Sequence, residues 1–192
     1  MPIDFTSTDT AFGVFVGLGL SAAAGLRIFI PLLVASAASL TGHLELASGF
    51  DWIGTTPALV GFAVAAALEI GAYLLPFLDN VLDALAAPAA TVAGTVLTAS
   101  SIVEMSSWLK WSLAIIAGGG IAGTVHLFTG ATRLTSTATT GGLANPAVST
   151  AEAGGALGVS VLAIATPIVG ALLALVLLYV AVRTLIRRRV RR

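Results

Sequence analysis

Two ionisable side chains, Arg27 and Glu69, lie deep within long apolar stretches of this sequence. If those stretches span a bilayer, a charge at its centre costs from about 3 to more than 10 kcal/mol, so each residue needs a counter-charge, a cavity or a bound ion. Gly25 favours a helix end beside Arg27, where backbone dipoles help to bind charge. Arg27 is therefore a candidate anion ligand, with a structural ion pair or a position at the membrane interface as the alternatives.

A second group of potential anion ligands follows later in the chain. His126 and Arg133 are seven residues apart, which places them on one helical face with Thr129 beside them. A run of serines and threonines that includes Thr137 comes next, and hydroxyls beside cations favour an anion. A helix–helix hydrogen bond is the alternative for His126. The predicted substrate-binding residues are Arg27, His126, Thr129, Arg133 and Thr137.

Acidic side chains recur along the second apolar stretch. Projected as one helix, Glu69, Tyr73, Asp79 and Asp83 fall within an arc of about 120°. A buried carboxylate tends to hold its proton, so this stripe predicts proton coupling. Asp79 and Asp83 could instead lie in headgroup water. Their spacing could also hold a divalent cation, as in membrane phosphotransferases, but the chain lacks the further carboxylates of such sites, and we do not expect an enzyme.

Glycine and proline interrupt the same apolar stretches. These residues tolerate non-helical backbone, which at membrane depth must line a cavity or be buried in protein. The predicted hinges are Gly19, Gly25, Pro31, Gly119, Gly142 and Pro146. Asn145 and Pro146 favour a turn, and Ser149 with Glu152 matches a helix-capping box.

The composition identifies the elements that position these residues. Hydrophobic residues make up 57% of the 192 and charged residues 9%, whereas soluble domains have about a quarter of their residues charged. A span needs roughly 20 apolar residues, so the sequence predicts an all-α membrane protein, one polytopic bundle over residues 1–192. The absence of cysteine excludes disulfides and thiolate chemistry.

About five hydrophobic segments can be distinguished. They cover residues 12–40, 57–85, 87–102, a segment from about 112 past 133, and 154–183. We expect the first and fourth to be broken or re-entrant because of their glycines. Residues 17–22 resemble residues 118–123, which raises a possible inverted repeat with halves 11–103 and 108–186, a feature of many transporters.

The charge distribution predicts the orientation. Six of the nine basic residues lie in the tail 183–192, which by the positive-inside rule belongs in the cytoplasm. The acidic N-terminus lacks the basic region of a secretory signal, so the first apolar segment should be retained. Five crossings would then place the N-terminus outside a bacterial inner membrane.

Two stretches carry a resemblance. The sequence from Gly17 through Arg27 to Pro31, and that from His126 to Glu152 with Arg133 and Asn145, are similar to those of a bacterial membrane family catalogued as domain of unknown function 4126. The resemblance implies an integral membrane protein and assigns no activity, cofactor or site residue.

The leading functional hypothesis is a small transporter or channel-like protein for an anionic or phosphate-bearing solute, with proton coupling through Glu69. We expect a homo-oligomer, in its simplest form a homodimer, in contact with membrane lipids, without a cofactor and without nucleic acid. Two alternatives remain open: a protein that binds a lipid headgroup or acts as a scaffold without transport, and a phosphotransferase that uses Asp79 and Asp83.

Overall fold

The computed structural model describes the backbone of residues 8–73 and 78–190, and the side chains of residues 9–73 and 85–187. Within these ranges the regular structure is entirely helical, as the composition predicts. The helices are α1 (Thr8–Leu26), α2 (Phe29–Leu40), α3 (Thr56–Tyr73), α4 (Leu78–Ser101), α5 (Ser107–Leu113), α6 (Gly120–Thr140), α7 (Asn145–Ala165) and α8 (Pro167–Val190), with a short 3₁₀ turn η1 (Asp51–Gly54) and a π-helical turn η2 (Ala114–Gly119).

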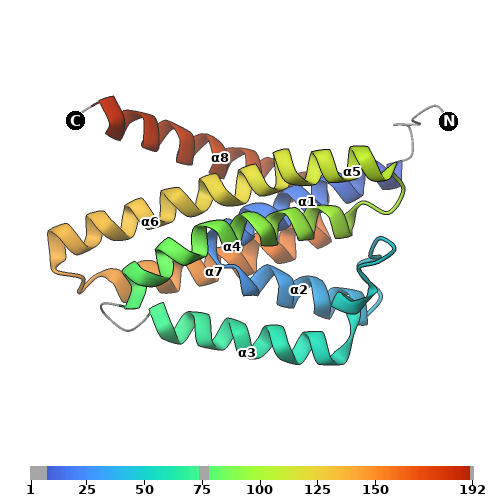
Figure 1. Cartoon of the computed structure of the whole chain (residues 1–192), viewed down its shortest axis with the longest axis horizontal. Coiled ribbons are helices and arrows are strands. Elements are labelled where there is room, and N and C mark those ends of the chain that lie inside the picture. The colour runs from blue at the N-terminus through green and yellow to red at the C-terminus, as the bar shows by residue number, and fades with distance from the viewer. Residues whose placement is uncertain (1–7, 74–77, 191–192) are drawn as a thin grey trace.

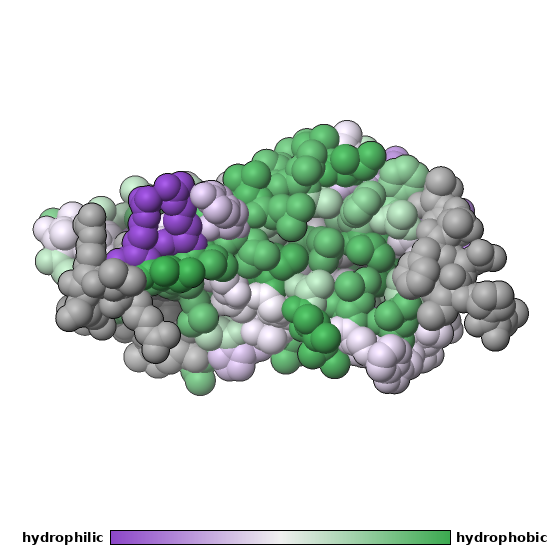
Figure 2. Space-filling view, turned by 90° about the horizontal axis from the view of Figure 1, so that it is seen from above, coloured by the Kyte–Doolittle hydropathy of each residue, from purple (hydrophilic) through white to green (hydrophobic). Residues whose placement is uncertain are grey.

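Five helical stretches are long and apolar enough to cross a membrane: residues 9–26, 56–73, 107–140, 145–165 and 167–187. A hydrophobic surface covers the middle of the molecule in Figure 2, and the strongly hydrophilic surface in that view lies at the end that carries the C-terminus. The chain is therefore a multi-pass α-helical membrane protein.

The predicted break in the first apolar segment is confirmed, and it lies at Arg27 and Ile28, between α1 and α2. From there α2 runs back in the opposite direction to α1 (Figure 1). The start of α1 and the loop after α2 both bond to the chain near the end of α4: the Thr10 hydroxyl donates to the carbonyl of Glu104 at 3.0 Å, and the Ala47 amide donates to the carbonyl of Ser100 at 2.8 Å. The chain thus reverses inside the bundle at a charged residue.

The single helix assumed for the second apolar segment is wrong. α3 ends at Tyr73 and α4 begins at Leu78, so Glu69 and Tyr73 lie on a different helix from Asp79 and Asp83. The projection of residues 57–85 as one helix, on which the predicted acidic stripe depends, therefore does not apply. The third segment is the later part of α4, which continues through Pro88.

Two further segments differ from expectation. Residues 107–140 form one uninterrupted helical stretch, because at the glycine run the helix widens to the π turn η2 instead of breaking. A Cβ on Gly118 or Gly119 would collide with Thr98 or Thr95 of α4, so these glycines permit close helix packing. The last segment is two helices: α7 ends before Thr166, and Pro167, which has no amide hydrogen to continue the helix, begins α8.

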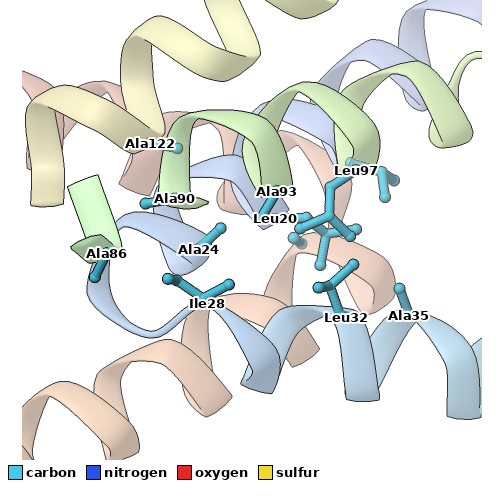
Figure 3. Packing of buried hydrophobic residues seen from close by; sticks show 12 residues of the cluster. Leu20, Ala24, Ile28, Leu32, Ala35, Ala86, Ala90, Ala93, Leu97 and Ala122 are labelled. Carbon is cyan, nitrogen blue, oxygen red and sulfur yellow. The ribbon is translucent and has the colours of Figure 1, made fainter. Parts of the chain in front are cut away.

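α1 is the central helix and packs against α4, α6, α7 and α8. Its contact with α4 includes a polar link, since the Ser21 hydroxyl donates to the carbonyl of Gly94 at 2.8 Å and lies 2.7 Å from the Thr98 hydroxyl. The apolar part of this core is built from small alanines and a few larger aliphatic residues (Figure 3). Such small residues let helix backbones approach closely in a membrane protein.

Candidate functional site

Arg27 lies at the α1–α2 reversal and is 1% exposed. Its Nη2 donates to the Ser149 hydroxyl at 2.5 Å and to the Ser149 carbonyl at 3.3 Å, and lies 3.3 Å from Oε2 of Glu152. Both partners are on α7. The first break in the fold is therefore joined through one guanidinium nitrogen to a helix more than 100 positions later in the chain.

Arg133 of α6 reaches the same carboxylate. Its Nη2 donates to Oε2 of Glu152 at 2.7 Å and its Nε donates to the same oxygen at 3.1 Å. Arg133 is 1% exposed and Glu152 is 8% exposed. The two arginines that the sequence singles out are thus brought together, and a carboxylate lies between them.

Tyr73, the last residue of α3, completes the group. The guanidinium carbons of Arg27 and Arg133 lie 4.0 Å and 4.2 Å from the centre of its ring, well within the range of cation–π attraction. We call Arg27, Tyr73, Arg133, Ser149 and Glu152 the arginine cluster. Its residues come from the α1–α2 break and from α3, α6 and α7.

Arg27 has donors to spare. Among the residues that the structure describes, its Nε and Nη1 are buried and have no hydrogen-bond partner. Leaving a buried donor unsatisfied costs about 1–3 kcal/mol, and more for a charged group. Buried polar groups are almost always paired, so this exception needs an explanation.

Glu69 lies next to the arginine cluster and has a different role. Its Oε1 accepts from the Ile28 amide at 2.9 Å and its Oε2 accepts from the Phe29 amide at 3.1 Å. These are free amides at the N-terminus of α2, where a negative charge also interacts favourably with the helix dipole. Glu69 of α3 is therefore a cap for α2. Whether it also exchanges a proton stays a prediction.

The remaining predicted ligands are spread along α6. His126 and Thr129 are buried two turns and one turn from Arg133, respectively, toward the α5 end, and the Thr129 hydroxyl donates to the carbonyl of His126 at 2.9 Å. The Thr137 hydroxyl accepts from Nδ2 of Asn145 at 2.9 Å, near the α6–α7 turn. The hydroxyl of Thr135 bonds to the carbonyl of Ala131 in its own helix. These hydroxyls thus make structural contacts, within α6 or at its turn to α7.

The predicted hinges fall into two groups. Gly19, Gly25, Pro31, Gly119 and Pro146 lie within helical stretches, and only Gly142, with a φ of 89°, lies in a turn. A Cβ on Gly25 would collide with the carbonyl of Ala122 and with Val125, so α1 approaches α6 closely there. In this structure Gly25 is a packing position.

The capping-box interpretation of Ser149 and Glu152 is wrong. α7 begins at Asn145, with Pro146 in its first turn, so Ser149 lies inside the helix instead of before it. Residues three apart within a helix share a face, and this face points to the two arginines. The signal in the sequence is Asn145 and Pro146. Interpreted as the start of a helix instead of a turn, they would have placed Ser149 and Glu152 on one helix face.

Asp79 and Asp83 lie on α4, and their side chains are outside the described residues. Among the side chains that are described, no group of three or more histidine, aspartate or glutamate residues is arranged to hold a metal ion. The phosphotransferase alternative stays a prediction.

A second polar region lies near the start of α1. A cavity of about 310 Å³ is lined by the carboxylates Asp9, Glu45 and Glu104. It shares His43 and Ile164 with an apolar groove of about 480 Å³ between α2 and α7. This region is the candidate site for a ligand that combines a cationic and an apolar part.

The chain belongs to the family described as Domain of unknown function (DUF4126), whose model matches residues 14–187. This confirms the resemblance seen in the sequence. No curated protein and no solved structure matches the chain. Its function must therefore be argued from its own residues.

Proposed function

We propose that this protein is a small transporter or channel of the bacterial inner membrane that binds and moves an anionic solute through the arginine cluster. The observation that carries the proposal is Arg27, a buried guanidinium with two nitrogens that lack a partner among the described residues. An oxyanion beside Arg27 would accept from these nitrogens. Guanidinium groups suit carboxylate and phosphate oxygens in charge and shape.

Glu152 supports an exchange mechanism. Its Oε2 contacts Nη2 of both Arg27 and Arg133, so it pairs with the same guanidinium groups that an anionic solute would bind. In this mechanism Glu152 neutralises the arginines while no solute is bound, and it yields part of their hydrogen bonds when the solute arrives. Ionisable residues buried in membrane proteins commonly mark such pathways.

The orientation follows from charge. Arg183 and Arg187 are exposed near the end of α8, and the positive-inside rule places this end in the cytoplasm. Arg133, two turns before the end of α6, and Glu152, two turns into α7, lie toward the same end. The arginine cluster is thus nearer the cytoplasmic side.

The test is flux into proteoliposomes with a panel of oxyanions: phosphate, sulfate and small carboxylates. Wild type should move at least one of them faster than protein-free liposomes do, and Arg27→Ala and Arg27→Met should lose that flux. Lys110→Ala removes a cation outside the cluster and should retain it. Gel filtration verifies that each variant is folded. Equal flux in wild type, both Arg27 variants and protein-free liposomes would contradict transport.

A second candidate, lipid binding without transport, is favoured by the cavity lined by Asp9, Glu45 and Glu104 and its apolar neighbour. The carboxylates suit the ammonium of an amine-bearing phospholipid, and the groove suits an acyl chain. Native mass spectrometry of the purified protein should then show such a lipid, which Glu45→Gln combined with Glu104→Gln should lose. Retention of the lipid by this double variant would exclude the site.

A further inference from the structure

The N-terminus of α2 is an anion site that the chain fills with its own side chain. Free amides at a helix N-terminus bind phosphate and carboxylate groups readily. Here the amides of Ile28 and Phe29 hold the carboxylate of Glu69, at 2.9 Å and 3.1 Å. They directly follow Arg27, whose Nε and Nη1 have no partner among the described residues, and Glu69 is close enough to Arg27 to interact electrostatically. Backbone amides and guanidinium donors are thus available on adjacent residues.

α3 carries the side chain that fills this site, and it is loosely held. Glu69 and Tyr73 are four residues apart, so they lie on one face of α3 and cover the α2 N-terminus and the guanidinium groups together. Of the 18 residues of α3, all of which are described, only Ala66 and Tyr73 are buried. Val60, Val64 and Leu68 are 56%, 55% and 68% exposed. Few protein contacts therefore hold α3 in place.

We propose that α3 is a gate and that Glu69 is an internal substitute for the solute. An incoming oxyanion takes the amides of Ile28 and Phe29 and the spare donors of Arg27, the Glu69 carboxylate leaves, and α3 moves away from α2. This inference rests on the proposed function and specifies its solute as an oxyanion, either free or carried on a lipid headgroup. Loosely packed elements are the ones that open most readily.

The first experiment measures binding of inorganic phosphate to the purified full chain in detergent by calorimetry, with a soluble short-chain phosphatidic acid as the lipid-borne arm. Removing the internal competitor in Glu69→Ala should tighten binding about tenfold, within the usual range for coupled sites. Glu69→Gln, which keeps one acceptor, should tighten it less. Asp51→Ala removes an exposed carboxylate near η1 and should bind as wild type does. Preference for one of the two probes identifies the source of the oxyanion.

Three outcomes distinguish the α3 gate from the proposed anion site. Tighter binding in Glu69→Ala, abolished by adding Arg27→Ala, supports both proposals. Unchanged or weaker binding in folded Glu69→Ala and Glu69→Gln, with Arg27→Ala still abolishing it, overturns the gate and leaves the proposed anion site intact. Failure of wild type and every variant to bind either probe overturns both.

The second experiment tests the movement of α3. Ile30 of α2 and Ala66 of α3 belong to the same buried cluster, and the chain has no native cysteine. A short, reducible thiol cross-linker across Ile30→Cys and Ala66→Cys should abolish phosphate flux in proteoliposomes, and reduction should restore it. The two single-cysteine variants should be unaffected by the reagent. Full flux with the link in place would exclude a moving α3.

Discussion

Arg133 donates two hydrogen bonds to Oε2 of Glu152, from Nη2 at 2.7 Å and from Nε at 3.1 Å, and both residues are buried. A guanidinium held through two nitrogens is fixed in orientation as well as position. Arg27 meets the same oxygen at 3.3 Å through one nitrogen. The two arginines are therefore unequal, since Arg133 is anchored while Nε and Nη1 of Arg27 have no partner in the described part of the chain.

Glu152→Gln should destabilise the protein strongly. Removing one partner of a buried ion pair costs about 3–5 kcal/mol because the other charge stays buried. For a chain of this size that corresponds to a fall in melting temperature of roughly 10 °C, measurable by thermal unfolding in detergent. Asp51→Asn removes an exposed carboxylate and should change the melting temperature little. If the melting temperature of Glu152→Gln equals that of the wild type, the ion pair does not stabilise the fold.

The aromatic ring of Tyr73 should matter more than its bulk. Tyr73→Phe keeps a ring against both guanidinium groups, whereas Tyr73→Leu removes it. Cation–π attraction contributes from about 0.5 to 2 kcal/mol, with the larger values at desolvated sites. We expect Tyr73→Leu to lower the melting temperature further than Tyr73→Phe does. Equal effects of the two substitutions would show that the ring is only a spacer.

Gly25 should tolerate no side chain. In Gly25→Ala the new Cβ collides with the carbonyl of Ala122 and with Val125, and overpacking of this kind costs about 1–3 kcal/mol. Gly61→Ala is the matched control, since a Cβ on that helical glycine meets nothing within 4 Å. It should be neutral or stabilising, because alanine favours a helix by about 1 kcal/mol over glycine. Unfolding temperatures that rank the two variants in the reverse order would contradict the α1–α6 packing.

Membrane topology can be tested with single cysteines in this cysteine-free chain. Ser106 precedes α5 at one end of the bundle, and Leu143, 88% exposed, lies in the α6–α7 turn at the other (Figure 1). With the end of α8 in the cytoplasm, a membrane-impermeant maleimide added to spheroplasts should label Ser106→Cys. Leu143→Cys should react only after the membrane is disrupted. The reverse pattern would invert the orientation, and labelling of both from one side would contradict the arrangement of spans.

The sequence predicts those parts of the fold that depend on local composition. A charge after Gly25 in an apolar stretch indicates a break, and α1 ends at Leu26. Hydropathy cannot separate α3 from α4, because residues 74–77 are themselves mostly apolar and only Pro76 indicates a change. Pro167 likewise indicates a kink in one long helix, whereas the structure has two separate helices, α7 and α8.

The candidate site is predictable only in part, for a different reason. Arg27 and Arg133 stand out because an isolated charge in an apolar segment is costly wherever it lies. Their partner Glu152 does not stand out, because pairing between α6 and α7 and between α7 and the α1–α2 break depends on helix packing, which no local pattern contains. Glu69 was identified, but its contact with the α2 amides required the α2–α3 arrangement.

The pairing of Arg27 with Ser149 has a consequence for biosynthesis. The two residues are 122 positions apart in the chain, and a ribosome adds about 5–20 residues per second. Roughly 6–24 s therefore pass between the synthesis of Arg27 and that of its native partner on α7. During this interval Arg27 needs water, a lipid headgroup or the insertion machinery as a temporary partner. We therefore expect the α1–α2 hairpin to reach its final depth only after α7 has been synthesised.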